Sequence, residues 1–139
     1  MAKAAVIYWS GTGNTAAMAE AVAKGLESAG FAVEVCSCDA FDAGQLSEYD
    51  RLAFGCPAMG DEVLEESEFE PFFEGIEGAL SGRKVALFGS YGWGDGQWMR
   101  DWVQRCKDDG ADVFEEGLIA NGEADAAECE SFGARFAAY

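Results

Sequence analysis

Short apolar runs alternate with longer segments of helical period along this chain of 139 residues. Runs of strand length occupy residues 4–9, 32–38, 51–55, 84–90 and 113–120. Between these runs, apolar side chains recur at every third or fourth position, as they do on one face of a helix. Alternation of this kind predicts an α/β fold, in which helices cover both faces of a parallel sheet.

Helical spacing is clear in four segments. Their apolar faces are formed by Thr15, Ala19, Val22, Ala23 and Leu26; by Phe69, Phe72, Phe73 and Ile76; by Met99, Trp102, Val103 and Cys106; and by Cys129, Phe132 and Phe136. Gly30 stands where a glycine commonly ends a helix. We expect five strands and about five helices. Because the sequence has no repeat and no low-complexity linker, we expect residues 1–139 to form a single domain.

The chain carries a net charge of −17, yet half of its residues are apolar and 13% are aromatic. This composition is too apolar for a disordered acidic chain, so the charge must lie on a folded surface. An acidic surface repels nucleic-acid phosphates and anionic lipids, and it attracts proteins that carry basic patches. The apolar run 4–9 is too short for a signal sequence or a membrane span, which favours a buried strand in a cytoplasmic protein.

Cysteine usage argues against a metal site or a disulfide framework. The chain has no histidine and five cysteines, which are Cys36, Cys38, Cys56, Cys106 and Cys129. An odd number of cysteines without C-x-x-C spacing does not match a common zinc site. We therefore expect reduced structural thiols and no bound metal.

A loop rich in glycine and hydroxyl groups, Ser10-Gly11-Thr12-Gly13-Asn14-Thr15, follows the first strand and opens the first helix. Backbone N–H groups at a helix N-terminus favour an anion, and glycines let it approach the backbone closely. The loop has no lysine, which excludes the P-loop of nucleoside triphosphatases. Residues 11–16 also satisfy the dinucleotide pattern G-x-G-x-x-A, with Glu34 or Asp39 as the acidic residue, so the pattern alone does not decide. Four short side-chain donors in the loop favour a single phosphate monoester.

Two further glycine-rich loops follow the third and fourth strands. They read Cys56-Pro57-Ala58-Met59-Gly60-Asp61-Glu62 and Ser90-Tyr91-Gly92-Trp93-Gly94-Asp95-Gly96. The carboxyl ends of parallel strands meet at one edge of a sheet, where ligands bind in open α/β folds. Met59 and Trp93 can enclose a flat ring there, through a sulfur contact and through aromatic stacking. The sequence therefore predicts a site for a flat, phosphorylated ligand.

All three loops resemble the signature loops of short-chain, clostridial-type flavodoxins, and the likeness extends over essentially the whole chain. It implies a flavodoxin-like three-layer sandwich, with a five-stranded parallel sheet in the order 2-1-3-4-5, and bound flavin mononucleotide (FMN). By position, residues 10–15 would hold the phosphate, Met59 and Trp93 would flank the isoalloxazine ring, and Glu62 would accept from its pyrimidine edge. The full set of expected cofactor contacts is Trp9, Ser10, Gly11, Thr12, Gly13, Asn14, Thr15, Pro57, Ala58, Met59, Gly60, Asp61, Glu62, Ser90, Tyr91, Gly92, Trp93 and Gly94.

The same resemblance implies an electron-transfer protein rather than an enzyme. It would be a low-potential one-electron carrier that cycles mainly between the semiquinone and the hydroquinone of FMN. Gly60 would permit a type II′ turn whose carbonyl group rotates toward the protonated N5 of the flavin. Acidic residues near the loops would oppose the second electron; they are Asp61, Glu62, Glu65, Glu66, Glu68, Glu70 and Asp95.

Expected partners are redox proteins with basic docking patches, such as ferredoxin or flavodoxin reductases and low-potential oxidoreductases, and we expect a monomer. The alternative is an FMN-dependent NAD(P)H or quinone reductase of the same fold, which would need room for a hydride donor. A phosphate-accepting receiver module also shares this fold but requires clustered aspartates. The corresponding positions hold Trp9-Ser10 and Cys56-Pro57, so we reject that function.

Overall fold

The computed structural model describes residues 2–60 and 62–139, in which six strands form one parallel sheet. The strands are β1 (Lys3–Tyr8), β2 (Ala32–Ser37), β3 (Arg51–Gly55), β4 (Lys84–Tyr91), β5 (Asp112–Val113) and β6 (Leu118–Asn121). The first five follow the order β2-β1-β3-β4-β5, and β6 also pairs with β4. The predicted strand order 2-1-3-4-5 is thus confirmed.

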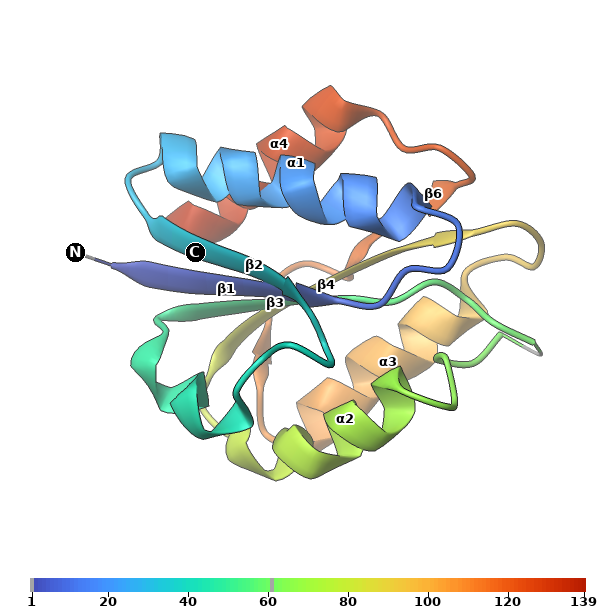
Figure 1. Ribbon diagram of the computed structural model, residues 1–139, viewed down its shortest axis with the longest axis horizontal. Coiled ribbons are helices and arrows are strands. Elements are labelled where there is room, and N and C mark those ends of the chain that lie inside the picture. The colour runs from blue at the N-terminus through green and yellow to red at the C-terminus, as the bar shows by residue number, and fades with distance from the viewer. Residues whose placement is uncertain (1, 61) are drawn as a thin grey trace.

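Helices cover both faces of the sheet. The described residues contain four α-helices, which are α1 (Asn14–Ser28), α2 (Phe69–Ile76), α3 (Gln97–Asp108) and α4 (Ala126–Ala138). Figure 1 shows α1 and α4 on one face and α2 and α3 on the other, so the molecule has three layers. The expectation of about five helices is wrong, because the connection between β2 and β3 carries only the 3₁₀ helix η1 (Ala43–Glu48). Leu46 is the buried residue of η1, and one apolar side chain does not support a full α-helix.

The fifth apolar run, predicted as one strand over residues 113–120, is divided into β5 and β6. Glu115 and Gly117 have φ angles of 52° and 83°, which no extended strand adopts. Phe114 packs against Phe132 and Phe136 of α4, with ring centroids 5.3 and 5.4 Å apart. The strand therefore breaks between Phe114, whose ring packs into the core, and Leu118, because the backbone is not extended at Glu115 and Gly117.

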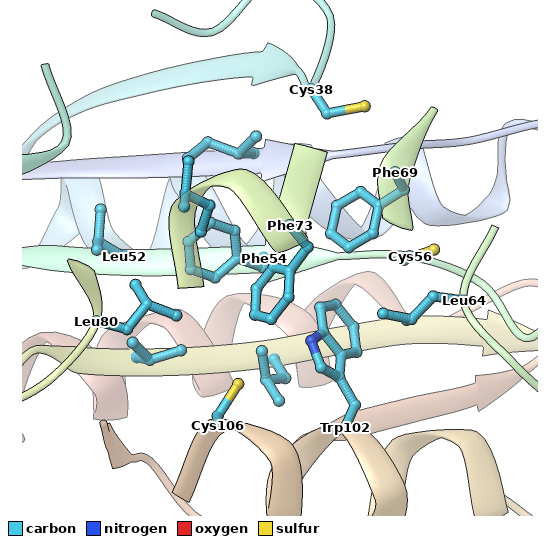
Figure 2. Close-up of a cluster of buried hydrophobic side chains, with 14 of the residues drawn as sticks. Cys38, Leu52, Phe54, Cys56, Leu64, Phe69, Phe73, Leu80, Trp102 and Cys106 are labelled. Atoms are coloured by element: carbon cyan, nitrogen blue, oxygen red, sulfur yellow. The ribbon is translucent and has the colours of Figure 1, made fainter. Parts of the chain in front are cut away.

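The apolar faces of the helices form two cores, one on each side of the sheet. Figure 2 shows the core under α2 and α3, where Phe54, Phe69, Phe73 and Trp102 lie close together. Trp102 meets the rings of Phe69 and Phe73 edge to face, at centroid distances of 5.5 and 5.7 Å. Aromatic pairs in this geometry add about 1 kcal/mol each to the effect of burial. Both helices are therefore firmly placed against the sheet.

All five cysteines are free thiols. Cys36 is half-buried and the other four are buried. Burial raises the pKa of Cys36 and of Cys38 to about 11, so both thiols stay protonated at neutral pH. Protonated thiols are poor nucleophiles and poor metal ligands, which is consistent with a structural role.

The parallel pairing brings the loops after β1, β3 and β4 to one edge of the sheet, on the right in Figure 1. Hydrogen bonds continue from the sheet into these loops: Trp9 N donates to Gly55 O at 3.0 Å, and Ala58 N donates to Ser90 O at 3.0 Å. The bases of the loops are thus held by the sheet itself. Within the described residues, no helix combines the length and apolar character that crossing a bilayer requires.

Candidate functional site

The three loops at this edge enclose a cavity of about 230 Å³. It is lined by Trp9, Gly11, Thr12, Asn14, Pro57, Ala58, Met59, Ser90, Tyr91, Gly92 and Gly122. A second hollow of about 530 Å³ shares Trp9, Gly11 and Thr12 with the first and extends to Ser37 and Asp39. The structure thus brings residues from all three predicted loops around one space.

Loop 10–15 passes directly from β1 into α1. Gly13 precedes the helix with a φ angle of 99°, a conformation that glycine adopts readily. Ser10 Oγ accepts a hydrogen bond from Gly13 N at 3.1 Å, which closes the loop on itself. No described side chain caps the first N–H groups of α1, so these groups are available to an anion. The loop therefore has the geometry of a phosphate cradle.

Thr15 differs from the rest of this loop because its hydroxyl points into the protein. Its side chain is buried, and Oγ1 lies 2.9 Å from Oγ of Ser90, which is also buried. This hydrogen bond ties the start of α1 to the end of β4. It uses the proton of only one of the two hydroxyls, so Thr15 can accept from Ser90 and still donate to an anion.

Met59 and Val63 pair in antiparallel fashion and close a hairpin at the tip of the loop after β3. Met59 N donates to Val63 O at 2.8 Å, and Val63 N donates to Met59 O at 3.0 Å. The expected four-residue turn begins at Met59 and ends at Glu62, whereas the observed bonds join Met59 to Val63. Gly60 has the positive φ that such a turn requires, at 52°, and Glu62 has a φ of 58°. The expected contact at Asp61 lies outside the described residues.

Cys56 anchors the base of the same loop. It is fully buried, and its thiol sulfur accepts a hydrogen bond from Glu65 N at 3.4 Å. Its carbonyl oxygen accepts another from Trp98 Nε1 at 3.1 Å. Burial raises the pKa of the Cys56 thiol far above its usual range, so the group acts as an uncharged anchor. The loop is thus fixed to α3 and to its own C-terminal end.

Glu62 turns toward α3, into a recess that it shares with Trp98 and Asp101. Its Oε1 atom accepts hydrogen bonds from Gly96 N at 3.2 Å and from Gln97 N at 3.1 Å. The residue expected to accept from the pyrimidine edge is therefore bound to the N-terminus of α3. Its other carboxylate oxygen has no hydrogen-bond partner among residues 2–60 and 62–139.

Two tryptophans lie at the rim. Trp93 follows Gly92 and is 64% exposed, and Met59 on the neighbouring loop is 38% exposed. Large apolar side chains left open to solvent beside a cavity commonly mark a binding surface. Trp9 lines both cavities, and its Nε1 donates to Glu68 Oε1 at 3.2 Å. Gly94 follows Trp93 with a φ of 90°.

Side-chain hydrogen bonds join each pair of loops. The Trp9–Glu68 bond joins the first loop to the segment after β3, and the Thr15–Ser90 pair joins the first loop to the end of β4. Glu62 joins the loop after β3 to the loop after β4. These links connect the three loops to one another, so contacts within the protein hold the shape of the cavity.

Comparison with known proteins identifies the family. The family model described as flavodoxin matches residues 6–133. The chain belongs to the flavodoxin family. It is 53% identical to the flavodoxin of Clostridium beijerinckii over 134 residues, which cover 95% of this chain and 97% of that protein. It is 44% identical to the flavodoxin of Megasphaera elsdenii over 128 residues, which cover 92% and 93%.

Solved structures agree with this assignment. The solution structure of two-electron reduced Megasphaera elsdenii flavodoxin matches with a TM-score of 0.90 and covers 98% of this chain and 99% of that one. Flavodoxins are electron-transfer proteins that carry FMN and work at low potential, and they are not enzymes. The uncapped N-terminus of α1 and the cavity beside it fit a phosphorylated ring of this kind.

Glu65 is the buried acid of the row that follows the Met59 loop in this flavodoxin. Its carboxylate is buried and accepts hydrogen bonds from the N–H groups of Ser67, Glu68 and Phe69 at 2.7–2.9 Å, and from the Ser67 hydroxyl. Desolvation raises the pKa of Glu65, but these hydrogen bonds outweigh it and lower the pKa to about 2. Glu65 is therefore a buried, ionised carboxylate that caps α2.

Three further acids, Glu70, Glu77 and Asp95, are paired with arginines. Arg105 makes two hydrogen bonds to Glu70, at 2.8 and 2.7 Å, and two to Glu77, both at 2.8 Å. The hydrogen bonds that Arg105 donates to Glu77, and then those to Glu70, raise the pKa of Arg105. Arg100 pairs with Asp95 at 3.0 Å. Glu70 and Asp95 are therefore paired charges, whereas Glu66 and Glu68 are exposed.

Sequence reasoning missed one residue of the cavity. Gly122, between β6 and α4, lines the cavity, and its N–H donates to Tyr91 O at 2.9 Å. It has a φ of 73°. The available signal is the Asn121-Gly122 dipeptide, a common turn sequence after a strand. A fourth loop therefore contributes to the site.

Proposed function

We propose that the cavity at the carboxyl edge of the sheet holds FMN, and that residues 1–139 act as one FMN-binding domain of a low-potential, one-electron carrier. The observation that supports this most directly is the meeting of an uncapped helix N-terminus with a cavity walled by all three loops. An anionic phosphate and a flat ring need these two features side by side. FMN supplies the redox chemistry, because it accepts and releases electrons one at a time.

The residues of the chain have distinct tasks in this proposal. The N–H groups of residues 11–15 and the side chains of Ser10, Thr12 and Asn14 hold the phosphate. Met59 and Trp93 cover the two faces of the ring, which excludes water from it. Trp9, Pro57, Ala58 and backbone groups of residues 90–94 line its edges, and Glu62 accepts from the pyrimidine edge through its unbound oxygen.

We further propose that this flavodoxin works as a cytoplasmic monomer and exchanges electrons with redox proteins that carry basic patches. The net charge of −17 supports this, because such a surface steers basic partners toward it and repels nucleic acid and anionic membranes. The exposed Trp93 places the ring close to the surface that a partner would approach. Short separation is what electron transfer between two proteins requires.

The test is a reductive titration of the purified protein loaded with FMN. The expected result is tight, 1:1 FMN uptake, followed by a long-wavelength absorption band that rises and then disappears as reductant is added. Steady oxidation of NAD(P)H by the protein alone would support the reductase alternative. A protein that does not bind FMN, or that takes both electrons in one step, would overturn the proposal.

A further inference from the structure

Helix α3 begins without a cap from its own sequence. The residue before it is Gly96, and no described neighbour in the loop supplies a side-chain hydrogen bond to the first N–H groups. The N–H groups of Gly96 and Gln97 are bound instead by Glu62, which lies 35 residues before Gln97 in the sequence. A carboxylate is well suited to this place, because the helix dipole is positive there. Glu62 thus acts as the cap of a distant helix.

The surroundings of Glu62 are shaped to permit this link. A Cβ atom on Gly94 would lie 2.5 Å from Glu62 Cδ, so any larger residue at position 94 would displace the carboxylate. Glu62 itself has a φ of 58°, a conformation that costs a non-glycine residue about 1 kcal/mol or more. A strained backbone persists only where the surrounding contacts require it. The backbone bonds between Met59 and Val63 and the two side-chain bonds to α3 are the described contacts that hold Glu62 in this conformation.

The link joins the two sides of the proposed ring site. Glu62 belongs to the hairpin that carries Met59, and its partners directly follow the loop that carries Trp93. The bases of these loops are already joined by the Ala58–Ser90 backbone bond and by the bond from Trp98 Nε1 to Cys56 O, and the carboxylate of Glu62 adds the link at their outer ends. Only Oε1 is used, so Oε2 stays available for a ligand.

We propose that Glu62 is a positioning residue that holds the Met59 and Trp93 loops at the spacing of a flat ring before FMN arrives. The identity of the ring as FMN rests on the proposed function, whereas the capping of α3 by Glu62 does not depend on it. A preformed site binds faster than one that must first assemble, because less order is imposed at the moment of binding. Glu62 therefore acts on the association rate of FMN, in addition to any contact that it makes with the bound ring.

The first experiment measures the cap without FMN. Hydrogen exchange of the Gly96 and Gln97 amides is compared in the wild-type chain, Glu62→Ala and Glu62→Gln. We expect exchange at both amides to be about tenfold faster in Glu62→Ala, since the acceptor is lost. Glu62→Gln retains a side-chain oxygen and should restore most of the protection. Unchanged exchange in Glu62→Ala would overturn the proposal, whatever the result of FMN binding.

The second experiment follows FMN association by stopped-flow fluorescence. Both Glu62 variants lose the same charge, so the difference between them isolates the hydrogen bonds from electrostatic repulsion of the phosphate. Glu62→Ala should bind FMN at least about threefold more slowly than Glu62→Gln. Gly94→Ala, which keeps the charge but displaces the carboxylate, should behave like Glu62→Ala, and Glu66→Gln serves as the control for charge alone. Equal association rates, with only dissociation faster in Glu62→Ala, would show that Glu62 is a ligand contact and not a positioning residue.

Discussion

Gly25 of α1 faces Gly133 of α4 where the two helices approach each other. A Cβ atom on Gly133 would lie 3.3 Å from Gly25 Cα and would overlap the carbonyl oxygen of Val22. A Cβ atom on Gly25 would lie 2.8 Å from the backbone N of Ala134. Both glycines are buried, so the two helix backbones are in direct contact. This close approach places α1, whose N-terminus is the proposed phosphate cradle, directly against α4.

Gly133→Ala is therefore expected to destabilise the protein. Forcing the helices apart costs about 1–3 kcal/mol, and the higher helix propensity of alanine returns at most about 1 kcal/mol. We expect a net loss of about 1–2 kcal/mol in the free energy of unfolding. Urea denaturation followed by circular dichroism measures it.

Gly75→Ala is the matched control. Gly75 lies in α2 and is exposed. A Cβ atom added at this position would project into open space in the described part of the chain. Only the helix propensity changes, so we expect a gain of up to about 1 kcal/mol. If both variants shifted stability in the same direction, the contact between α1 and α4 would not be as tight as described.

These glycines show where sequence reasoning about the fold ends. A parallel sheet covered on both faces was predictable because the runs of β1, β3 and β4 are continuously apolar and buried, whereas the strand order came from the resemblance of the loops to those of flavodoxins. A glycine within a helical pattern does not identify the helix that it contacts, so the Gly25–Gly133 approach was not predictable. The break at Gly117 was missed for a related reason: an apolar run records burial, and Phe114 is buried against α4 rather than within the sheet.

A second prediction concerns acid stability. The pKa of Glu65 is about 2 in the folded protein, below its ordinary value of 4.5. The ionised group therefore stabilises the fold fully above about pH 4.5, and this contribution is lost as the pH falls toward 2. Glu65→Gln should be less stable than wild type at neutral pH, and the difference should shrink below about pH 4.5.

Unfolding free energies of both proteins at several pH values measure this difference. Glu66→Gln is the control, because Glu66 is the exposed neighbour of Glu65 in the same loop. That variant should run parallel to wild type throughout the acid range. A constant gap between Glu65→Gln and wild type from pH 7 to about pH 2 would contradict the capping role of Glu65.

Asp109 predicts the opposite pH dependence. Desolvation, and then its contact with the ionised Glu77, raises the pKa of Asp109 to about 6. The group also stands at the C-terminal end of α3, where the helix dipole disfavours a negative charge. For an acid with a raised pKa, stability is lost as the pH rises from the ordinary value of 3.8 through about 6.

Asp109→Asn removes this titration. The variant should be more stable than wild type above about pH 6 and close to it near pH 4. Thermal unfolding at both pH values is the measurement. Asp108→Asn, at the exposed neighbouring position, should not show the same pH-dependent gain. A gain of equal size at pH 4 and pH 8 would indicate a cause other than the titration of Asp109.

A fourth prediction tests the proposed ring site. Trp93→Ala should weaken FMN binding about tenfold or more, because stacking and apolar burial are both lost. Ile119→Ala is the control. Ile119 is also an exposed apolar residue, but it lines a different groove, beside α3. Fluorescence titration with FMN gives both dissociation constants. Equal affinity in the two variants would remove Trp93 from the proposed site.

The site, like the fold, was predictable only in part. The three loops were identified from glycines and hydroxyls at strand ends, because that chemistry is local in sequence. The links between the loops were not, since the partners of Trp9, Thr15 and Glu62 lie far away along the chain. The burial of Glu65 was not predictable either, because a row of acidic residues does not reveal which carboxylate turns inward to cap a helix.

The last prediction follows from the difference between the buried or paired acids near the loops and the exposed ones. Glu66 is exposed and lies in the segment that follows the Met59 hairpin, so it is a candidate for opposing the second electron. At a separation of about 10 Å and an effective dielectric constant of about 20, screened by physiological salt, one charge shifts a one-electron potential by about 20 mV. Glu66→Gln should therefore raise the lower of the two midpoint potentials by about this amount.

Glu48→Gln provides the reference for this measurement. Glu48 pairs with Lys3 at the start of β1, which is the opposite edge of the sheet. A strand of six residues spans about 20 Å, more than twice the screening length at physiological salt. Removing this charge should leave both potentials unchanged. A rise in Glu48→Gln equal to that in Glu66→Gln would mean that the net charge of the protein, and not the placement of Glu66, sets the potential.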